Sequence, residues 1–253
     1  ASATATITDN DSATADLSVT QNGNETGPVD IVFTVTLDKV NNTASAITFD
    51  LTDLGTGTAA SGADYTAFGG SAAISVPVGS STGSVTVTVT DDSLLEANTE
   101  TVNAQISNSS NGDVTIGTAS ATATITDNDS ATADLSVTQH GDEAGPVNIV
   151  YTVTLDKVNN TSAAITFDLI DLGTGTATGG ADYTTFGGAA AISVAVGSST
   201  GSVTVTVTDD TLLEANTETV IAQISNSSNG DVTIGTASAT ATITDNDSAT
   251  ADL

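Results

Sequence analysis

Residues Ser84 to Thr90 read SVTVTVT, with valine and hydroxyl-bearing residues in strict alternation. A period of two places successive side chains on opposite faces of an extended chain, so this stretch predicts a β-strand with one apolar face. Val29 to Leu37 and Ala119 to Thr126 alternate in the same way, although the latter offers only Ala and Ile to its apolar face. Turn residues such as Asn111-Gly112 separate these stretches. The pattern therefore predicts an all-β fold.

Outward from this stretch, the same alternation predicts further strands. We predict seven between residues 12 and 129, at 15–20, 29–38, 45–52, 71–76, 83–90, 100–107 and 119–126. The one helix-like stretch, Leu94 to Thr99, is short. Seven short strands in one domain-sized segment are typical of an immunoglobulin-like β-sandwich, and a barrel is the weaker alternative.

The chain contains a long internal repeat. The string ATITDNDSATADL occurs at Ala5, Ala123 and Ala241, which gives a period of 118 residues, the size of one whole domain. We therefore expect two tandem sandwiches. The predicted divisions are 1–11 as the last strand of a preceding repeat, 12–129 and 130–247 as the two repeats, and 248–253 as the start of a following one.

The composition excludes several classes of function. The chain has 31 Asp and Glu against two Lys, a formal charge of −29. Phosphate binding needs clustered Lys and Arg, so nucleic acid is excluded as a partner, and an anionic membrane surface is disfavoured. No apolar run is long enough to insert directly into a membrane. The single histidine, His140, makes no catalytic triad, and we expect no enzyme.

Strand direction brings the acids of one repeat together. If strands alternate up and down, the loops after the first, third and fifth strands and the end of the last strand share one pole. Nine of the 14 acids of the first repeat fall there: Glu25, Asp53, Asp64, Asp91, Asp92, Glu96, Glu100, Asp127 and Asp129. The one lysine of this repeat, Lys39, is expected at the opposite pole. Nine carboxylates cannot stay ionised together at low cost without a counter-charge.

Calcium is the counter-charge that this composition favours. Ca²⁺ takes 6–8 oxygen ligands with flexible geometry, so nine carboxylates suffice for about two to three ions per repeat. Zinc and copper prefer His or Cys, and the chain has no Cys and only His140. A merely solvated acidic pole is the alternative. None of the loops has the spacing of an EF-hand.

Three motifs resemble those of a known family. They are GTAASGADY at Gly57 to Tyr65, TDDSLLEANTETV at Thr90 to Val102, and ATATITDND at Ala121 to Asp129. In this order and spacing they resemble the Calx-beta domain, a calcium-binding sandwich, and the resemblance covers both repeats. Two departures are visible: Thr99 is an apparent one-residue insertion before Glu100, and Thr56 stands where the family has an aspartate.

The resemblance implies which residues bind Ca²⁺. By carry-over these are Asp91, Asp92, Glu96, Asp127 and Asp129, with Asp209, Asp210, Glu214, Asp245 and Asp247 in the second repeat, and Asn128 and Asn246 in the middle of each closing triplet. The remaining candidate ligands are the other acids of the same pole. They are Glu25, Asp53, Asp64 and Glu100, their equivalents Glu143, Asp171, Asp182 and Glu218, and Asp9 and Asp11 of the first segment.

Near-identical tandem copies, extreme acidity and the absence of Cys resemble the extender region of a bacterial RTX-type adhesin. We therefore expect a monomeric structural spacer at the bacterial cell surface, whose partners are neighbouring repeats of the same chain and whose Ca²⁺ ions rigidify the array. A regulatory Ca²⁺ sensor is the first alternative. An adhesive module that binds a ligand through its loops is the second, although these loops, DKVNNTAS and SNSSNGDVTIGT, carry no aromatic anchor.

Overall fold

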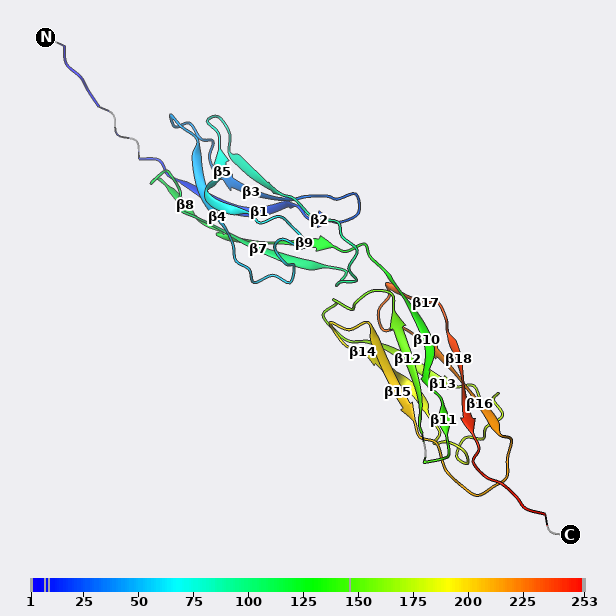
Figure 1. The fold of residues 1–253 in the computed structure, drawn as a ribbon. Helices are drawn as coiled ribbons and strands as arrows, with labels where there is room; N and C mark the ends of the chain where they lie inside the picture. The colour runs from blue at the N-terminus through cyan, green and yellow to red at the C-terminus, as the bar shows by residue number, and fades with distance from the viewer. Residues whose placement is uncertain (1, 7, 9, 146, 252–253) are drawn as a thin grey trace. The chain divides into compact units, whose positions relative to one another are not determined.

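A computed structural model describes the chain except residues 1, 7, 9, 146, 252 and 253, and it leaves the side chain of residue 190 undescribed. The described residues form strands and no helix (Figure 1). No described segment is therefore a helix long and apolar enough to cross a membrane. The predicted all-β class is confirmed.

The first repeat is a sandwich of two sheets. One has the order β6-β3-β1-β8 and the other the order β2-β9-β7-β4-β5. The strands are β1 (Ala13–Gln21), β2 (Gly23–Asn24), β3 (Ile31–Leu37), β4 (Ile47–Asp53), β5 (Gly69–Val76), β6 (Thr82–Val87), β7 (Glu100–Ser107), β8 (Val114–Ile116) and β9 (Ser120–Thr126). All seven predicted strands are present within a few residues, and β2 and β8 are additional.

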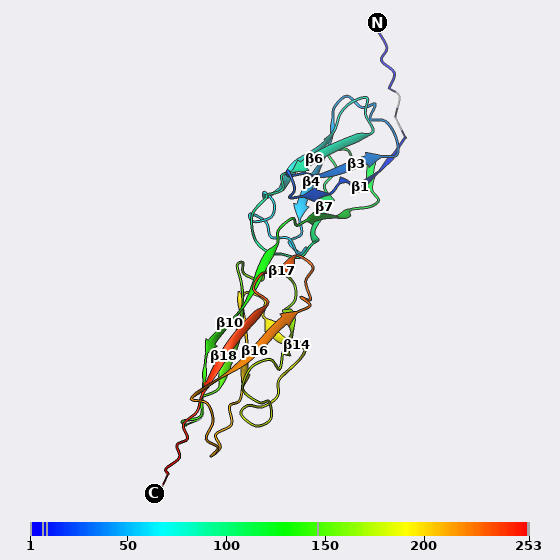
Figure 2. The same ribbon diagram turned by 90° about the vertical axis from the view of Figure 1, so that its right-hand side faces the viewer.

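The second repeat has the same topology, with sheets β15-β12-β10-β17 and β11-β18-β16-β13-β14. Its strands are β10 (Ala131–Gln139), β11 (Gly141–Asp142), β12 (Ile149–Leu155), β13 (Ile165–Asp171), β14 (Gly187–Val194), β15 (Thr200–Val205), β16 (Thr217–Ser225), β17 (Val232–Ile234) and β18 (Ser238–Thr244). Figure 2 shows β18 beside β16, the pair on which the acids converge.

Alternation along the strands builds each core. In β12 the side chains of Ile149, Tyr151 and Val153 are fully buried between the sheets, and Phe167 of β13 faces them from the other sheet. Burying such side chains contributes about 1.5–3 kcal/mol each. Phe186 lies against Tyr151 with ring centroids 5.7 Å apart.

The short helix-like stretch Leu94 to Thr99 forms no helix. Leu95 instead joins an isolated parallel β-bridge with Asn159, and its neighbours have no regular structure. By spatial compactness the chain divides into one unit of 1–92 and 98–128, and a second of 93–97 and 129–253. Ser93–Ala97 therefore belongs to the second unit, although its sequence lies inside the first repeat.

The described residues of 1–11, where we expect the last strand of a preceding repeat, are assigned to no strand, and residues 1, 7 and 9 lie outside the described residues. The same sequence, SATATIT, forms β9 at Ser120–Thr126 and β18 at Ser238–Thr244. There, hydrogen-bonded neighbours flank it on both sides. Strand formation depends on partners at least as much as on pattern.

Candidate metal centre

A short parallel strand brings the first acid of the second repeat to the others. After β10 ends at Gln139, the chain enters the opposite sheet as β11, which pairs with β18 through Gly141↔Ile243 and Asp142↔Thr244. The Glu143 amide then donates to Thr244 O at 3.1 Å. Gly141 permits this approach, because a Cβ there would stand 2.8 Å from Val207 Cγ2. Glu143 is thereby placed beside the residues that follow β18.

The first acidic group of this repeat combines Glu143 with Asp245 and Asp247. One carboxylate oxygen from each lies within 4.8 Å of the others. Asp245 is held by backbone donors on both oxygens, from the amide of Glu214 at 3.2 Å and from that of Asp247 at 2.9 Å. Glu143 is only 2% exposed.

The second group combines Asp182, Glu214 and Glu218, again within 4.8 Å. Asp182 is 2% exposed, and its Oδ2 accepts the amide of Thr178 at 2.6 Å. Its carbonyl accepts the amide of Thr208 at 2.8 Å, which ties this loop to the chain after β15. Glu218 lies on β16 opposite Ile243 of β18, so both groups are built around one end of β18.

The equivalent positions of the first repeat gather in the same way. Glu25 groups with Asp127 and Asp129, and Asp64 groups with Glu96 and Glu100. Glu25 and Asp64 are each 2% exposed. Glu100 is thus grouped despite the apparent insertion of Thr99, because it opens β7, which pairs with β9 at Ile125.

Mutual repulsion and burial raise the pKa values in the second repeat. Burial first, and then the charges of Asp245, Asp210 and Glu214, raise the pKa of Glu143 from 4.5 to about 7. Burial, with Asp182 hydrogen-bonded and charged beside it, raises the pKa of Glu218 to about 7. The pKa of Glu214 and that of Asp247 are also raised, by desolvation and then by neighbouring carboxylates.

Several buried oxygens in these groups have no donor. Among the described residues, none donates to Glu143 Oε2, Asp182 Oδ1 or Asp247 Oδ2, although each atom is shielded from solvent. Asp64 Oδ1 in the first repeat is in the same situation. A buried acceptor without a partner costs about 1–3 kcal/mol, and more when it is charged. A bound cation would satisfy these atoms and lower the repulsion together.

Other predicted ligands are placed outside the groups. Asp53 and Asp171 accept the hydroxyl protons of Tyr65 and Tyr183, each at 2.7 Å. Asp91 and Asp209 accept the side-chain amides of Asn128 and Asn246 at 3.2 and 3.1 Å. Asp92, Asp210 and Asp11 lie outside the four groups, and Asp9 lies outside the described residues.

Asp210 nevertheless acts on the groups. Its Oδ1 accepts the amide of Leu212 at 2.7 Å, and its charge contributes to the raised pKa of Glu143, Glu214 and Asp247.

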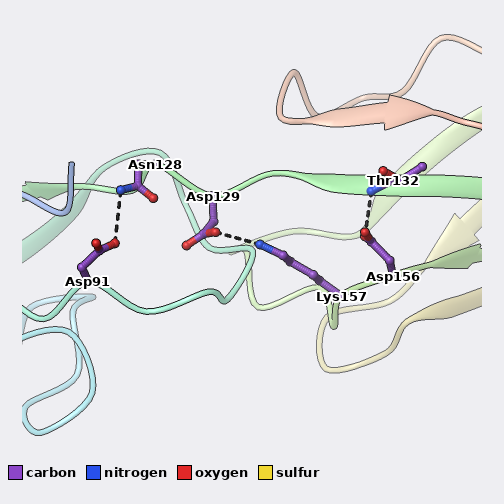
Figure 3. A network of polar contacts seen from close by, with 6 residues as sticks. All are labelled: Asp91, Asn128, Asp129, Thr132, Asp156 and Lys157. Carbon is purple, nitrogen blue, oxygen red and sulfur yellow. Dashed lines mark hydrogen bonds and ion pairs between the residues drawn. The ribbon is translucent and has the colours of Figure 1, made fainter. Parts of the chain in front are cut away.

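A lysine pairs with one of these acids, although the sequence predicted that the only lysine of the first repeat, Lys39, lies at the opposite pole. Lys157 Nζ lies 2.7 Å from Asp129 Oδ1 (Figure 3). Asp129 is the first residue of the longer segment of the second compact unit. The composition of one repeat does not predict this pair, because Asp129 belongs to the first repeat and Lys157 to the second.

The arrangement suits a hard divalent cation. Each group offers three carboxylates, and the remaining positions can be filled by carbonyls, waters or second carboxylate oxygens, as Ca²⁺ accepts. The chain has no Cys and one His, which disfavours zinc or copper.

Comparison with known proteins agrees with this chemistry. The model of the Calx-beta domain matches residues 5–129 and 135–247. The chain belongs to the Calx-beta domain family. Tandem Calx-beta domains are known as calcium-binding modules.

Solved structures with tandem Calx-beta domains are similar to this chain. CBD12 from CALX1.2 is 16% identical and covers 90% of this chain and 99% of its own, with a TM-score of 0.38. The calcium binding domain CBD12 of CALX1.1 is 15% identical and covers 90% of this chain and 99% of its own, with a TM-score of 0.37. The apo form of the Calx CBD1 domain is 22% identical and covers 47% of this chain and 100% of its own, with a TM-score of 0.37. No curated protein matches the chain.

The family motif departs from its usual form at Thr56, and the structure shows what replaces it locally. Thr56 Oγ1 accepts a hydrogen bond from Asn103 Nδ2 at 3.1 Å on the exposed side of the sheet. The nearby Asp53 is engaged by Tyr65. Neither residue belongs to the acidic groups of this Calx-beta chain.

Proposed function

We propose that both Calx-beta repeats bind Ca²⁺, several ions each, at the four acidic groups, and that this binding stabilises the folded repeats. The observation that carries the proposal is the set of buried carboxylate oxygens for which the described residues supply no donor. Mere solvation explains exposed acids, but it does not explain Glu143 and Asp182, each 2% exposed. A ligand that binds only the folded state stabilises it by mass action.

We further propose that the repeats are extender modules of a large bacterial surface adhesin, with Ca²⁺ making the array stiff. Support comes from the near-identity of the repeats and from the chain between them. Only Asp127 to Ser130 connect β9 to β10, fewer residues than the sequence suggested, and two of them, Asp127 and Asp129, group with Glu25. Ca²⁺ held there would immobilise most of the connecting torsions.

Calcium titration calorimetry on the full chain tests the metal assignment. We expect Glu143→Gln to lower the number of bound ions, because the variant keeps the size of the side chain and removes one charge from the first group. The matched control is Asp134→Asn. Asp134 accepts the amide of Thr236 at 2.6 Å, away from the groups, so its variant should keep the full stoichiometry.

An unchanged ion count in Glu143→Gln would exclude the first group as a site. Equal losses in Glu143→Gln and Asp134→Asn would indicate diffuse binding to the acidic surface. A regulatory sensor remains the alternative if Ca²⁺ binds with full stoichiometry but leaves the flexibility of the two-repeat chain unchanged.

A further inference from the structure

The second compact unit buries one leucine that the sequence places in the first repeat. Leu95 is fully buried and belongs to the core cluster that contains Leu155, Ile165 and Val232. Its backbone forms a parallel bridge with Asn159, and its carbonyl accepts the amide of Asn160 at 2.9 Å. Side chain and main chain are therefore both engaged.

A buried asparagine, Asn159, holds the loop that receives this leucine, and we call this loop the seat. Asn159 has no exposed surface, and its Nδ2 donates to Ala163 O at 3.0 Å and to Val194 O at 3.1 Å. Its carbonyl accepts the amide of Gly197 at 2.8 Å. These bonds fix the loop so that the next amide, of Asn160, points to Leu95.

The first unit contains the same seat. Asn41 is 2% exposed and donates to Ser45 O and Val76 O, each at 3.0 Å, and its carbonyl accepts the amide of Gly79 at 2.8 Å. The loop is thus held as in the second unit. No acceptor among the described residues takes the amide of Asn42, the equivalent of Asn160.

A pocket of about 330 Å³ lies at this seat. Its apolar lining includes Leu37, Ile47 and Val114, the equivalents of Leu155, Ile165 and Val232. Lys39 and Asn41 also line it. Three residues of the core cluster that contains Leu95 in the second unit thus have counterparts around a pocket in the first.

The second repeat carries the segment that fits this pocket. LLEANTETV occurs at 94–102 and again at 212–220, so Leu213 is the equivalent of Leu95. Leu213 is 62% exposed, whereas Leu95 is 0% exposed. Identical local sequence with opposite burial means that the seat, not the segment, decides whether the leucine is covered.

We propose that the pocket of the first unit is a docking site for the Leu213 segment of a second copy of this chain, seated as Leu95 is in the second unit. Leu213 fills the apolar pocket, and its carbonyl accepts the amide of Asn42. One leucine and one backbone bridge make a contact well below a standard interface, so free copies associate weakly and head to tail. Copies joined in one chain would dock at high effective concentration.

Paramagnetic relaxation between two copies detects such weak contacts. The chain has no Cys, so Thr211→Cys gives a single attachment point for a nitroxide, two residues from Leu213. The nitroxide chain, at natural isotope abundance, is mixed at millimolar concentration with a ¹⁵N-labelled chain in Ca²⁺. The salt concentration is about 1 M, where the Debye length is about 3 Å, so that non-specific charge interactions are screened. We expect selective broadening of amides at Asn42, Lys39 and Val114, with little at Asn160, Lys157 and Val232.

The control separates docking from general stickiness. Leu213→Asp in the nitroxide chain should abolish the selective broadening. Leu212→Asp should retain it, because Leu212 is a neighbouring leucine, 57% exposed, that is not equivalent to the seated residue. Circular dichroism of both variants checks that they fold.

Absence of selective broadening in the parent mixture, or broadening that survives Leu213→Asp, would overturn the proposal. Equal broadening at Asn42 and at Asn160 would also overturn it. Leu95 would then not block access of the nitroxide chain to the site in the second unit. The readout is contact between copies and not metal occupancy, so failure here leaves calcium binding untouched.

Discussion

At the scale of single residues, the raised pKa values of Glu143 and Glu218 are the physical signature of the acidic groups. Both stand near 7 because burial and neighbouring carboxylates disfavour the ionised form. A proton and a metal ion are alternative ways to relieve the same repulsion. Below about pH 7 protons compete with the metal ion for these carboxylates, and above it the carboxylates are ionised and free to bind the metal ion.

This competition predicts the pH dependence of stability without metal. Each folded pKa lies above its ordinary value of 4.5, so the stability contributed by the bound proton is complete below about pH 4.5 and is lost as the pH rises through about 7. In chelator, the melting temperature of the second repeat should therefore fall between pH 5 and pH 8. In saturating Ca²⁺ the fall should disappear, because the ionised groups are then held by metal. A chelated protein that becomes more stable over this range would contradict the assignment.

A second prediction separates two aspartates that the sequence treats alike. Asp182 belongs to an acidic group, whereas Asp171 accepts the Tyr183 hydroxyl at 2.7 Å. Asp182→Asn should lower the calcium stoichiometry measured by calorimetry. Asp171→Asn should keep it and weaken one hydrogen bond, a change of about 1 kcal/mol or less in the free energy of unfolding. The opposite pattern would mean that Asp171 is the ligand.

Several residue roles could not be predicted from the sequence. Strand direction alone placed the acids at one pole, but the meeting of Glu143 with Asp245 depends on β11, a two-residue strand too short to show periodicity. The engagement of Asp171 by Tyr183 depends on a loop geometry with no sequence signal. The Lys157–Asp129 pair joins residues of different repeats and is invisible to any count within one repeat.

At the scale of elements, the strands were predictable and the segment after β6 was not. Alternation such as SVTVTVT marks a half-buried strand because the two faces of the sheet have different surroundings. The stretch Leu94 to Thr99 has no such alternation, so its own sequence does not specify a strand. Its conformation follows from the seat at Asn159, and its copy beginning at Leu212 shows that the same letters are also compatible with exposure.

The two equivalent leucines give a matched prediction. Leu95→Ala should lower the free energy of unfolding of the second unit by about 2–3 kcal/mol, because it removes a fully buried leucine from the core cluster. Leu213→Ala should change it by less than about 0.5 kcal/mol, because that side chain is 62% exposed. Denaturant unfolding of both variants measures the difference. Equal effects would show that Leu95 is not seated in solution.

At the scale of the whole molecule, the predicted fold class of two tandem sandwiches is confirmed, and the extender role is a proposal with a measurable consequence. The connection Asp127 to Ser130 includes Asp127 and Asp129, which group with Glu25. If Ca²⁺ holds them, the hinge loses most of its freedom. Small-angle scattering in Ca²⁺ should therefore give a narrower distribution of distances than scattering in chelator. The β content of each repeat should change less. Identical distributions would argue against an extender while leaving metal binding intact.

Thermal unfolding of the full chain near pH 7.5, in chelator and in millimolar Ca²⁺, tests the central claim most directly. Ca²⁺ should raise the melting temperature of both repeats, because it binds buried carboxylate oxygens to which none of the described residues donates. Mg²⁺ at the same concentration should raise it less, since Mg²⁺ demands a smaller octahedral site and dehydrates reluctantly. Equal melting temperatures in chelator and in Ca²⁺ would contradict the assignment of the acidic groups as stabilising calcium sites.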